Sequence, residues 1–255
     1  MELRFLWIGG TGAPPQSKSY YQPILDVAEE FVNRADFEPI FMLGLGEMKT
    51  ATGHIGEKYF EGNDDRFILG GHSQGGIIAS LLGMKYSDRV LAVISVAGPF
   101  KGTAWADPIN MPIRGFVEAV TQLSGGGIRL KPALRRFVVP IIPIVKDLAA
   151  HSDVSEEVLE YLATQVGGHE THAFIGTGDM FVFPHRSANP VGPLVTNYIV
   201  APADEYHRLL PVLPDSLVHI NAHTGHLTII HRPQVLQQIR KIIVRHTQAL
   251  ALAQN

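Results

Sequence analysis

The most informative absence in this 255-residue sequence is cysteine, which does not occur at all. Without a thiol, the chain has no disulfide, no thiolate metal ligand and no cysteine nucleophile. An excess of positive charge is also lacking, because 21 basic residues face 24 acidic ones and leave a formal net charge of −3. Proteins that bind nucleic acid through bulk charge carry a basic excess, so we expect no nucleic-acid partner.

Long apolar runs are missing too. The first ten residues, MELRFLWIGG, lack the basic segment and the long apolar segment of a signal peptide. The longest apolar run, Phe137–Val145, is too short to cross a bilayer and contains two prolines. We therefore expect a soluble protein without a transmembrane segment, either cytoplasmic or secreted by an export segment that this sequence does not include.

What the sequence does contain is an alternation of strand-like and helix-like segments. Short apolar runs are typical of buried strands, and apolar residues three and four positions apart indicate amphipathic helices. Strands are expected at Leu3–Gly9, Glu38–Gly44, Arg66–Gly71, Arg89–Gly98, Thr171–Gly176 and Ser216–Ala222, and helices at Tyr20–Ala35, Ile77–Ser87 and Pro233–Ala253. This order predicts an α/β domain with a minimal, mostly parallel sheet of about six strands and helices on both faces.

Two segments interrupt the alternation within what we expect to be one domain, residues 1–255. Asp107–Gly168 has helical stretches but no strand, and we interpret it as a helical cap or lid. Apolar side chains and basic ones are interspersed in it, which suggests that it covers an apolar pocket and contacts a lipid surface. The proline-rich segment Asn189–Pro214 predicts an irregular excursion near the edge of the sheet.

A serine stands among four glycines in the stretch Gly70–Gly76, GGHSQGG, between an expected strand and an expected helix. Gly71, Ser73 and Gly75 match G-x-S-x-G, and the strand–turn–helix context is the one that a nucleophile elbow requires. Such a turn strains the serine and crowds the positions two residues away on either side, where glycine fits. Ser73 is therefore the candidate nucleophile, and the alternative is a glycine-rich turn with a passive serine.

A serine hydroxyl becomes a nucleophile when a base accepts its proton and a third group orients that base. After an elbow of this kind, the acid and then the histidine follow along the chain. Asp179, in a glycine turn just after an expected strand, is the best candidate acid, with Asp204 and Asp215 as alternatives. His226, on a loop beyond the last strand, is the candidate base, and His223 is second.

Attack on a carbonyl carbon creates an oxyanion that two backbone N–H groups usually bind. We expect one donor at Gln74, directly after the serine, and the other at Thr11 in the loop IGGTGAP after the first strand. A simple glycine turn at this loop is the alternative, and the two interpretations are compatible.

Phosphate and metal motifs are weak. The GGTG stretch lacks the lysine of a phosphate-binding loop, and no strand is followed by G-x-G-x-x-G. His223 and His226 have no carboxylate near them in the sequence, and HETH at His169–His172 has the wrong spacing for a zinc protease. We interpret both histidines of HETH as ordinary loop residues, and we expect no metal and no cofactor.

Four segments together resemble the α/β-hydrolase superfamily, and within it the bacterial triacylglycerol lipases and esterases. GHSQGG is similar to the lipase elbow, GPFKGTAWAD to the segment after the next strand, GTGDMFVFP to the acid turn and GHLTIIHRP to the histidine loop. The resemblance implies an α/β-hydrolase fold with a lid. It also assigns five roles: nucleophile Ser73, acid Asp179, base His226, and oxyanion donors Thr11 and Gln74.

The sequence departs from that family's pattern in three places. Gly9-Gly10 stands where the family usually has His-Gly before the oxyanion residue, and Phe100 stands where the segment after the elbow usually has histidine. The separation between Asp179 and His226 is longer than usual, because the segment Asn189–Pro214 lies between them.

These features predict a serine hydrolase that cleaves carboxylic esters through a Ser–His–Asp triad and an acyl-enzyme intermediate. Two alternatives stay open: a thioesterase, acyltransferase or peptidase with the same machinery, and a non-catalytic binding protein of the same fold. The expected partner is a small-molecule or lipid ester whose acyl group the cap covers, and the sequence indicates no oligomeric state.

Overall fold

The computed structural model describes residues 1–10, 13, 15–40, 47–103, 147–149, 151–179, 182, 188–209 and 217–253. These residues form one seven-stranded sheet in the order β2-β1-β3-β4-β5-β6-β7, in which all neighbouring strands are parallel. The strands are β1 (Leu3–Ile8), β2 (Arg34–Glu38), β3 (Arg66–His72), β4 (Val90–Val96), β5 (Glu170–Gly176), β6 (Val195–Ala201) and β7 (Leu217–Asn221).

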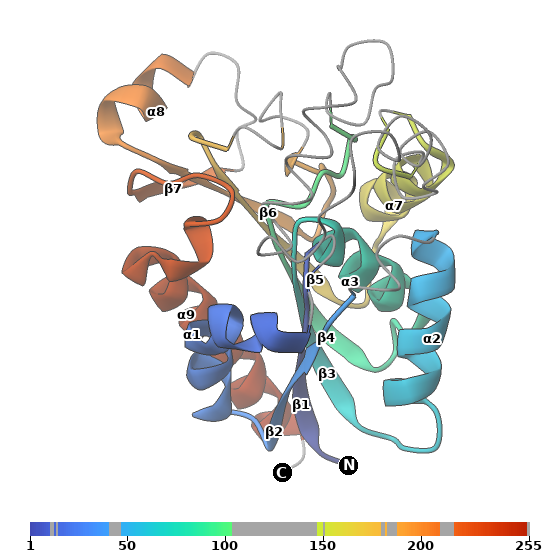
Figure 1. Ribbon diagram of the computed structural model, residues 1–255. Helices are drawn as coiled ribbons and strands as arrows, with labels where there is room; N and C mark the ends of the chain where they lie inside the picture. Colours follow the sequence, from blue (N-terminus) through green and yellow to red (C-terminus); the bar gives the residue numbers. More distant parts are fainter. Residues whose placement is uncertain are drawn as a thin grey trace.

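Helices cover both faces of this sheet (Figure 1). One face carries α1 (Lys18–Glu29) and α9 (Pro233–Ala253), and the other carries α2 (Met48–Phe60), α3 (Gln74–Lys85) and α7 (Asp153–Thr164). The short helix α8 (Ala203–Leu209) follows β6, and two single turns lie at Pro15–Ser17 and Ile229–His231. A parallel sheet covered in this way needs apolar residues on both faces, which is why its central strands are almost continuously hydrophobic.

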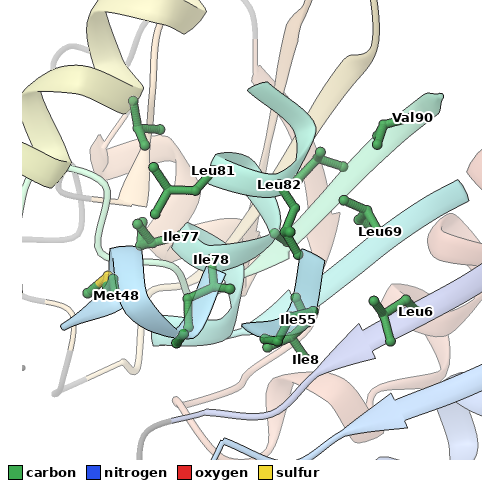
Figure 2. Close-up of a cluster of buried hydrophobic side chains, with 14 of the residues drawn as sticks. Leu6, Ile8, Met48, Ile55, Leu69, Ile77, Ile78, Leu81, Leu82 and Val90 are labelled. Carbon is green, nitrogen blue, oxygen red and sulfur yellow. The ribbon is translucent and has the colours of Figure 1, made fainter. Parts of the chain in front are cut away.

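Each face of the sheet has its own hydrophobic core, because alternate residues of a strand point to opposite sides. Along β1, Leu6 and Ile8 face α2 and α3, whereas Phe5 and Trp7 face α1 and α9. Figure 2 shows the first of these cores, in which Leu6, Ile8 and other strand residues meet leucines and isoleucines of α3. Truncating one such buried side chain to alanine typically costs about 2–5 kcal/mol, so these contacts fix where α3 lies on the sheet.

The α/β fold class predicted from the sequence is confirmed, and the sheet has seven strands where about six were expected. The additional strand is β6, inside the segment Asn189–Pro214 that was expected to be irregular. Its second half, Tyr198–Ala201, is buried, and the prolines that obscured the strand lie just outside it, where they cost no ladder hydrogen bond.

Other boundaries also differ from the expected ones. β2 ends at Glu38, where the second strand was expected to begin, because this edge strand carries the charged sequence RADFE and has no apolar run. Helix α2 was not expected, since two glycines interrupt its pattern. Most of the expected cap Asp107–Gly168 lies outside the described residues, and its last part contains α7, which packs against the core beside α3.

None of the helices in the described part of the chain is long and apolar enough to cross a membrane.

Gly70 of β3 offers a test of how tightly the sheet packs, because a methyl group there would overlap the buried ring of Trp7. We expect Gly70→Ala to lower the free energy of unfolding by about 1–3 kcal/mol through this overpacking. Gly53 in α2 is the matched control, since a methyl group there meets nothing within 4 Å. Gly53→Ala should raise the stability by about 0.5–1 kcal/mol, because alanine favours a helix. Urea denaturation measures both changes, and equal shifts in the two variants would contradict the packing described here.

Candidate active site

The turn between β3 and α3 holds Ser73 in a strained backbone conformation, with φ 56° and ψ −125°. A residue other than glycine rarely adopts a positive φ, and such strain persists only where the surrounding structure enforces it. A side chain at Gly71 would overlap the backbone of Gly75, and one at Gly75 would overlap the carbonyl oxygen of Ile8. The two glycines of the motif therefore permit the close approach of strand and helix that forms the turn.

Two of the expected partners meet at the carboxyl edge of the sheet. Asp179 follows β5, His226 follows β7, and Asp179 Oδ2 lies 2.8 Å from His226 Nδ1. Both side chains are almost completely buried, with exposed fractions of 1% and 2%. The second carboxylate oxygen, Oδ1, accepts a hydrogen bond from the backbone N–H of Val182 at 2.9 Å. The carboxylate thus accepts a hydrogen bond from Nδ1–H, and in that tautomer of the imidazole the lone pair lies on Nε2.

Backbone contacts hold the loops of these two residues against each other. The N–H of Gly178 donates to the carbonyl oxygen of Thr224 at 3.0 Å, and the N–H of Asp179 donates to Gly176 at 3.0 Å. The long sequence separation between acid and histidine is explained by β6 and α8, which form one more strand–helix unit between β5 and β7. The longer segment thus adds a strand to the sheet, and the side chains of Asp179 and His226 still meet.

His72, the residue before the serine, is a site residue that sequence reasoning missed. Its Nε2 lies 2.8 Å from the backbone oxygen of His226, and its Nδ1 lies 3.3 Å from Tyr21 Oη. A carbonyl oxygen can only accept a hydrogen bond, so the proton of the His72 ring is on Nε2. Nδ1 therefore accepts a hydrogen bond from the Tyr21 hydroxyl. Tyr21 Oη in turn accepts the backbone N–H of Gly10 at 3.1 Å. A continuous chain of buried hydrogen bonds therefore joins the loop after β1 to the loop that carries His226.

Burial keeps the groups of this chain uncharged. Desolvation, and to a smaller extent the neighbouring His226, lower the pKa of His72 to about 3. Desolvation also raises the pKa of Tyr21 to about 12. A neutral His72 that already donates to a carbonyl oxygen is not a second base; its contacts position the backbone of His226.

One of the two expected oxyanion donors, Gln74, belongs to the part of the chain that the structure describes. Gln74 begins α3 and is completely buried, and the amino end of this helix favours negative charge. Its side-chain amide makes no hydrogen bond to any part of the chain that the structure describes. Thr11 lies outside the described residues, and the N–H of the preceding residue, Gly10, donates to Tyr21 Oη.

Two of the three alternative residues are exposed. Asp204 is exposed in the first turn of α8, His223 is exposed, and Asp215 lies outside the described residues. The interpretation as a loop residue holds for His169, which directly precedes β5, and is wrong for His172, which belongs to β5. Both side chains are buried.

A parallel sheet with helices on both faces, a strained serine after β3 and an Asp–His pair after later strands define an α/β protein with a sharp strand–serine–helix turn. A family model described as "alpha/beta hydrolase fold" matches residues 61–122, which contain this elbow. No curated protein matched the chain.

Solved structures resemble the chain over nearly its whole length. A carboxylesterase study of the thaumarchaeon Nitrososphaera gargenis supplies one, with 13% identity, 97% of this chain and 92% of that chain covered, and a TM-score of 0.58. A structure from the metagenome-derived lipolytic enzymes LipS and LipT has 13% identity, coverage of 96% and 94%, and a TM-score of 0.58. The meta-cleavage product hydrolase of Pseudomonas fluorescens IP01 has 15% identity, coverage of 97% and 91%, and a TM-score of 0.56. The protein has the α/β-hydrolase fold.

The buried neutral state of His72 predicts an acid-sensitive stability. An unfolded histidine has a pKa of about 6.5, so between that pH and about 3 the unfolded chain binds a proton that folded His72 does not. The free energy of unfolding then falls on acidification by up to about 1.4 kcal/mol per pH unit for each such group. His169 and His246, whose pKa values burial lowers to about 4, add to the slope.

We expect His72→Gln, which keeps an amide donor but does not titrate, to reduce this slope by up to about 1.4 kcal/mol per pH unit below pH ~6.5. His54→Gln is the control, because His54 is exposed on α2. Urea denaturation between pH 7.5 and 5 measures both variants. The same slope in His72→Gln and in the wild type would contradict a neutral buried His72.

Proposed function

We propose that the protein is a serine hydrolase that cleaves carboxylic esters, with Ser73 as nucleophile, His226 as base and Asp179 as the group that orients the base. The observation that carries this proposal is the 2.8 Å contact between Asp179 Oδ2 and His226 Nδ1, at the sheet edge where the strained Ser73 also lies. Orientation of a histidine by a buried carboxylate is what activates a serine in hydrolases of this type.

The proposed reaction has two halves. Ser73 Oγ forms a bond to the ester carbonyl carbon while its proton passes to His226 Nε2, and the backbone N–H groups of Gln74 and Thr11 bind the resulting oxyanion. The bond to the alcohol oxygen then breaks, and His226 returns the proton to that oxygen, which leaves an acyl group on Ser73. A water molecule next attacks the acyl carbon while one of its protons passes to His226. The bond between this carbon and Ser73 Oγ then breaks, the carboxylic acid leaves, and His226 returns the proton to Ser73 Oγ. Asp179 stabilises the imidazolium that forms in each half.

An ester substrate is preferred here over the other bonds that this machinery can cleave. Two of the similar folds come from studies of carboxylesterases and lipolytic enzymes, which favours esters. A thioesterase, an acyltransferase or a peptidase would use the same residues. A non-catalytic binding protein would have no need for a buried Asp–His contact next to a strained serine. The acyl pocket under a cap at Asp107–Gly168, and its contact with lipid, remain proposals from the sequence.

Ser73 can be tested with a fluorophosphonate, which reacts covalently with activated serines. We expect labelling of the wild type and loss of labelling in Ser73→Ala. Ser80→Ala is the matched control, because Ser80 lies on the same helix and its hydroxyl donates to a backbone oxygen at 3.0 Å. Mass spectrometry shows which serine carries the adduct. In a second experiment, the rates of cleavage of p-nitrophenyl esters, thioesters and peptide amides are compared to identify the type of bond that the protein cleaves. An unlabelled wild type would refute the nucleophile, and faster cleavage of thioesters or amides would refute the ester.

Asp179→Asn tests the orienting role. The amide cannot hold the histidine in the tautomer that leaves Nε2 free to accept a proton, so kcat should fall by roughly 10⁴-fold with little change in KM. Asp204→Asn, which alters an exposed carboxylate on α8, should keep nearly full activity. Steady-state kinetics on one ester measures kcat and KM for both variants and the wild type. If Asp179→Asn stays active, another carboxylate holds the base.

A further inference from the structure

A second group of titratable side chains gathers at the opposite end of β5 from Asp179. Glu170 and His172 are two residues apart on β5 and therefore point to the same face of the sheet, the face that α9 covers. His246 comes from α9. Among the residues that the structure describes, these three form a group whose ligand atoms all lie within 4.8 Å of one another.

Their ligand atoms converge on one point. Glu170 Oε2 lies 3.4 Å from His172 Nε2 and 3.9 Å from His246 Nε2. Between them lies one guanidinium nitrogen of Arg245, which binds Glu170 Oε2 and lies 3.3 Å from His172 Nε2 and 3.4 Å from His246 Nε2. Two imidazole nitrogens and a carboxylate oxygen therefore surround a single cationic nitrogen.

A second layer of contacts fixes the orientation of His172. Its other ring nitrogen, Nδ1, lies 3.3 Å from Tyr198 Oη, and Gln238 Nε2 lies 3.4 Å from the same hydroxyl. A partner on Nδ1 that directs Nε2 toward a shared point is the arrangement found for histidines that bind metals. One side of the group is open, because Glu170 is 39% exposed and Arg245 is 55% exposed, whereas His172 is buried.

We propose that Glu170, His172 and His246 form a binding site for a divalent transition-metal ion of the zinc class, which the ion occupies by displacing the guanidinium of Arg245. Two imidazole nitrogens and one carboxylate oxygen are a donor set that zinc binds, and water from the open side completes the tetrahedron. Zinc bonds of about 2.0–2.2 Å place neighbouring ligand atoms roughly 3.3–3.6 Å apart. The two distances from Glu170 Oε2, 3.4 and 3.9 Å, are close to this range, and the two imidazole nitrogens, which lie within 4.8 Å of each other, have to move together. The exposed side chain of Arg245 can turn into solvent.

The site is remote from the proposed reaction and does not depend on it. Glu170 begins β5 and Asp179 follows its other end, so the two lie roughly 20 Å apart along the strand direction. A metal there links α9 to β5 and thereby fastens the last helix to the sheet. The competing explanation is that Arg245 and Glu170 serve only as an ion pair between the same two elements.

Removing the competing cation distinguishes the two explanations. In Arg245→Gln, the three ligand atoms remain and the positive charge is gone, so zinc should bind about tenfold more tightly than in the wild type, or tighter still. Arg240→Gln is the matched control. Arg240 is a similarly exposed arginine of α9, 49% exposed, and pairs with Glu30 away from the histidines. Its loss should leave zinc affinity unchanged.

The measurements are calorimetric titration of the folded, full-length chain with zinc chloride at pH 7.5 and thermal unfolding with and without zinc. We expect Arg245→Gln to bind one zinc ion per chain tightly and to have a higher Tm with zinc than without it. The double variant Glu170→Gln/Arg245→Gln should lose this tight binding. Equal affinity in Arg245→Gln and in Arg240→Gln would overturn the proposal, as would tight binding that survives the loss of Glu170. Should Arg245→Gln fail to fold, His246→Gln in the wild-type background decides instead: an affinity reduced at least tenfold supports the site, and an unchanged one overturns it.

Discussion

The strained turn at Ser73 is the constraint on which the rest of this structure depends. A positive φ at a residue with a side chain costs about 1–3 kcal/mol, and it persists only where packing leaves the backbone no alternative. The packing here comes from α3, whose residues from Gln74 to Gly83 are all buried. Buried strands lie beneath that helix and α2 and α7 lie beside it, so the hydrophobic core of this face determines where the serine stands.

The loop that carries His226 runs along the edge of the sheet toward β3. Ser73 follows β3 and His226 follows β7, four strand positions away, which corresponds to about 19 Å. The chain from Asn221 to His226 can span at most about 18 Å, so even when extended it falls short of β3, and the side chain of His72 bridges the remaining distance. The bond between Gly178 and Thr224 fastens it above β5, and the bond from His72 to the backbone of His226 fastens it beside β3. These two hydrogen bonds hold the loop from Asn221 to His226 in one position along the sheet edge.

What the sequence could predict follows from how local each signal is. The elbow is encoded within seven residues, and Asp179 and His226 each sit directly after a strand, so a motif and a strand order were enough to select them. β6 was missed because flanking prolines resemble a loop until its neighbours β5 and β7 are known. His72 occupies a variable position of the motif, and its partner Tyr21 lies on α1, so no nearby pattern identifies it. The group around Glu170 requires the approach of α9, which only the folded chain provides.

The two ends of β5 carry the same chemical groups in different electrostatic settings, and this difference separates their roles. At the carboxyl end, Asp179 bonds one imidazole and one backbone N–H, so its charge acts on His226. At the amino end, the charge of Glu170 is shared by a guanidinium and two imidazoles, and the hydrogen bond with His172, together with the charge of Arg245, lowers the pKa of this carboxyl to about 2. The carboxylate of Asp179 is directed at the imidazole of His226. A carboxylate that already holds a cation can only exchange it for another, which is the behaviour of a binding site.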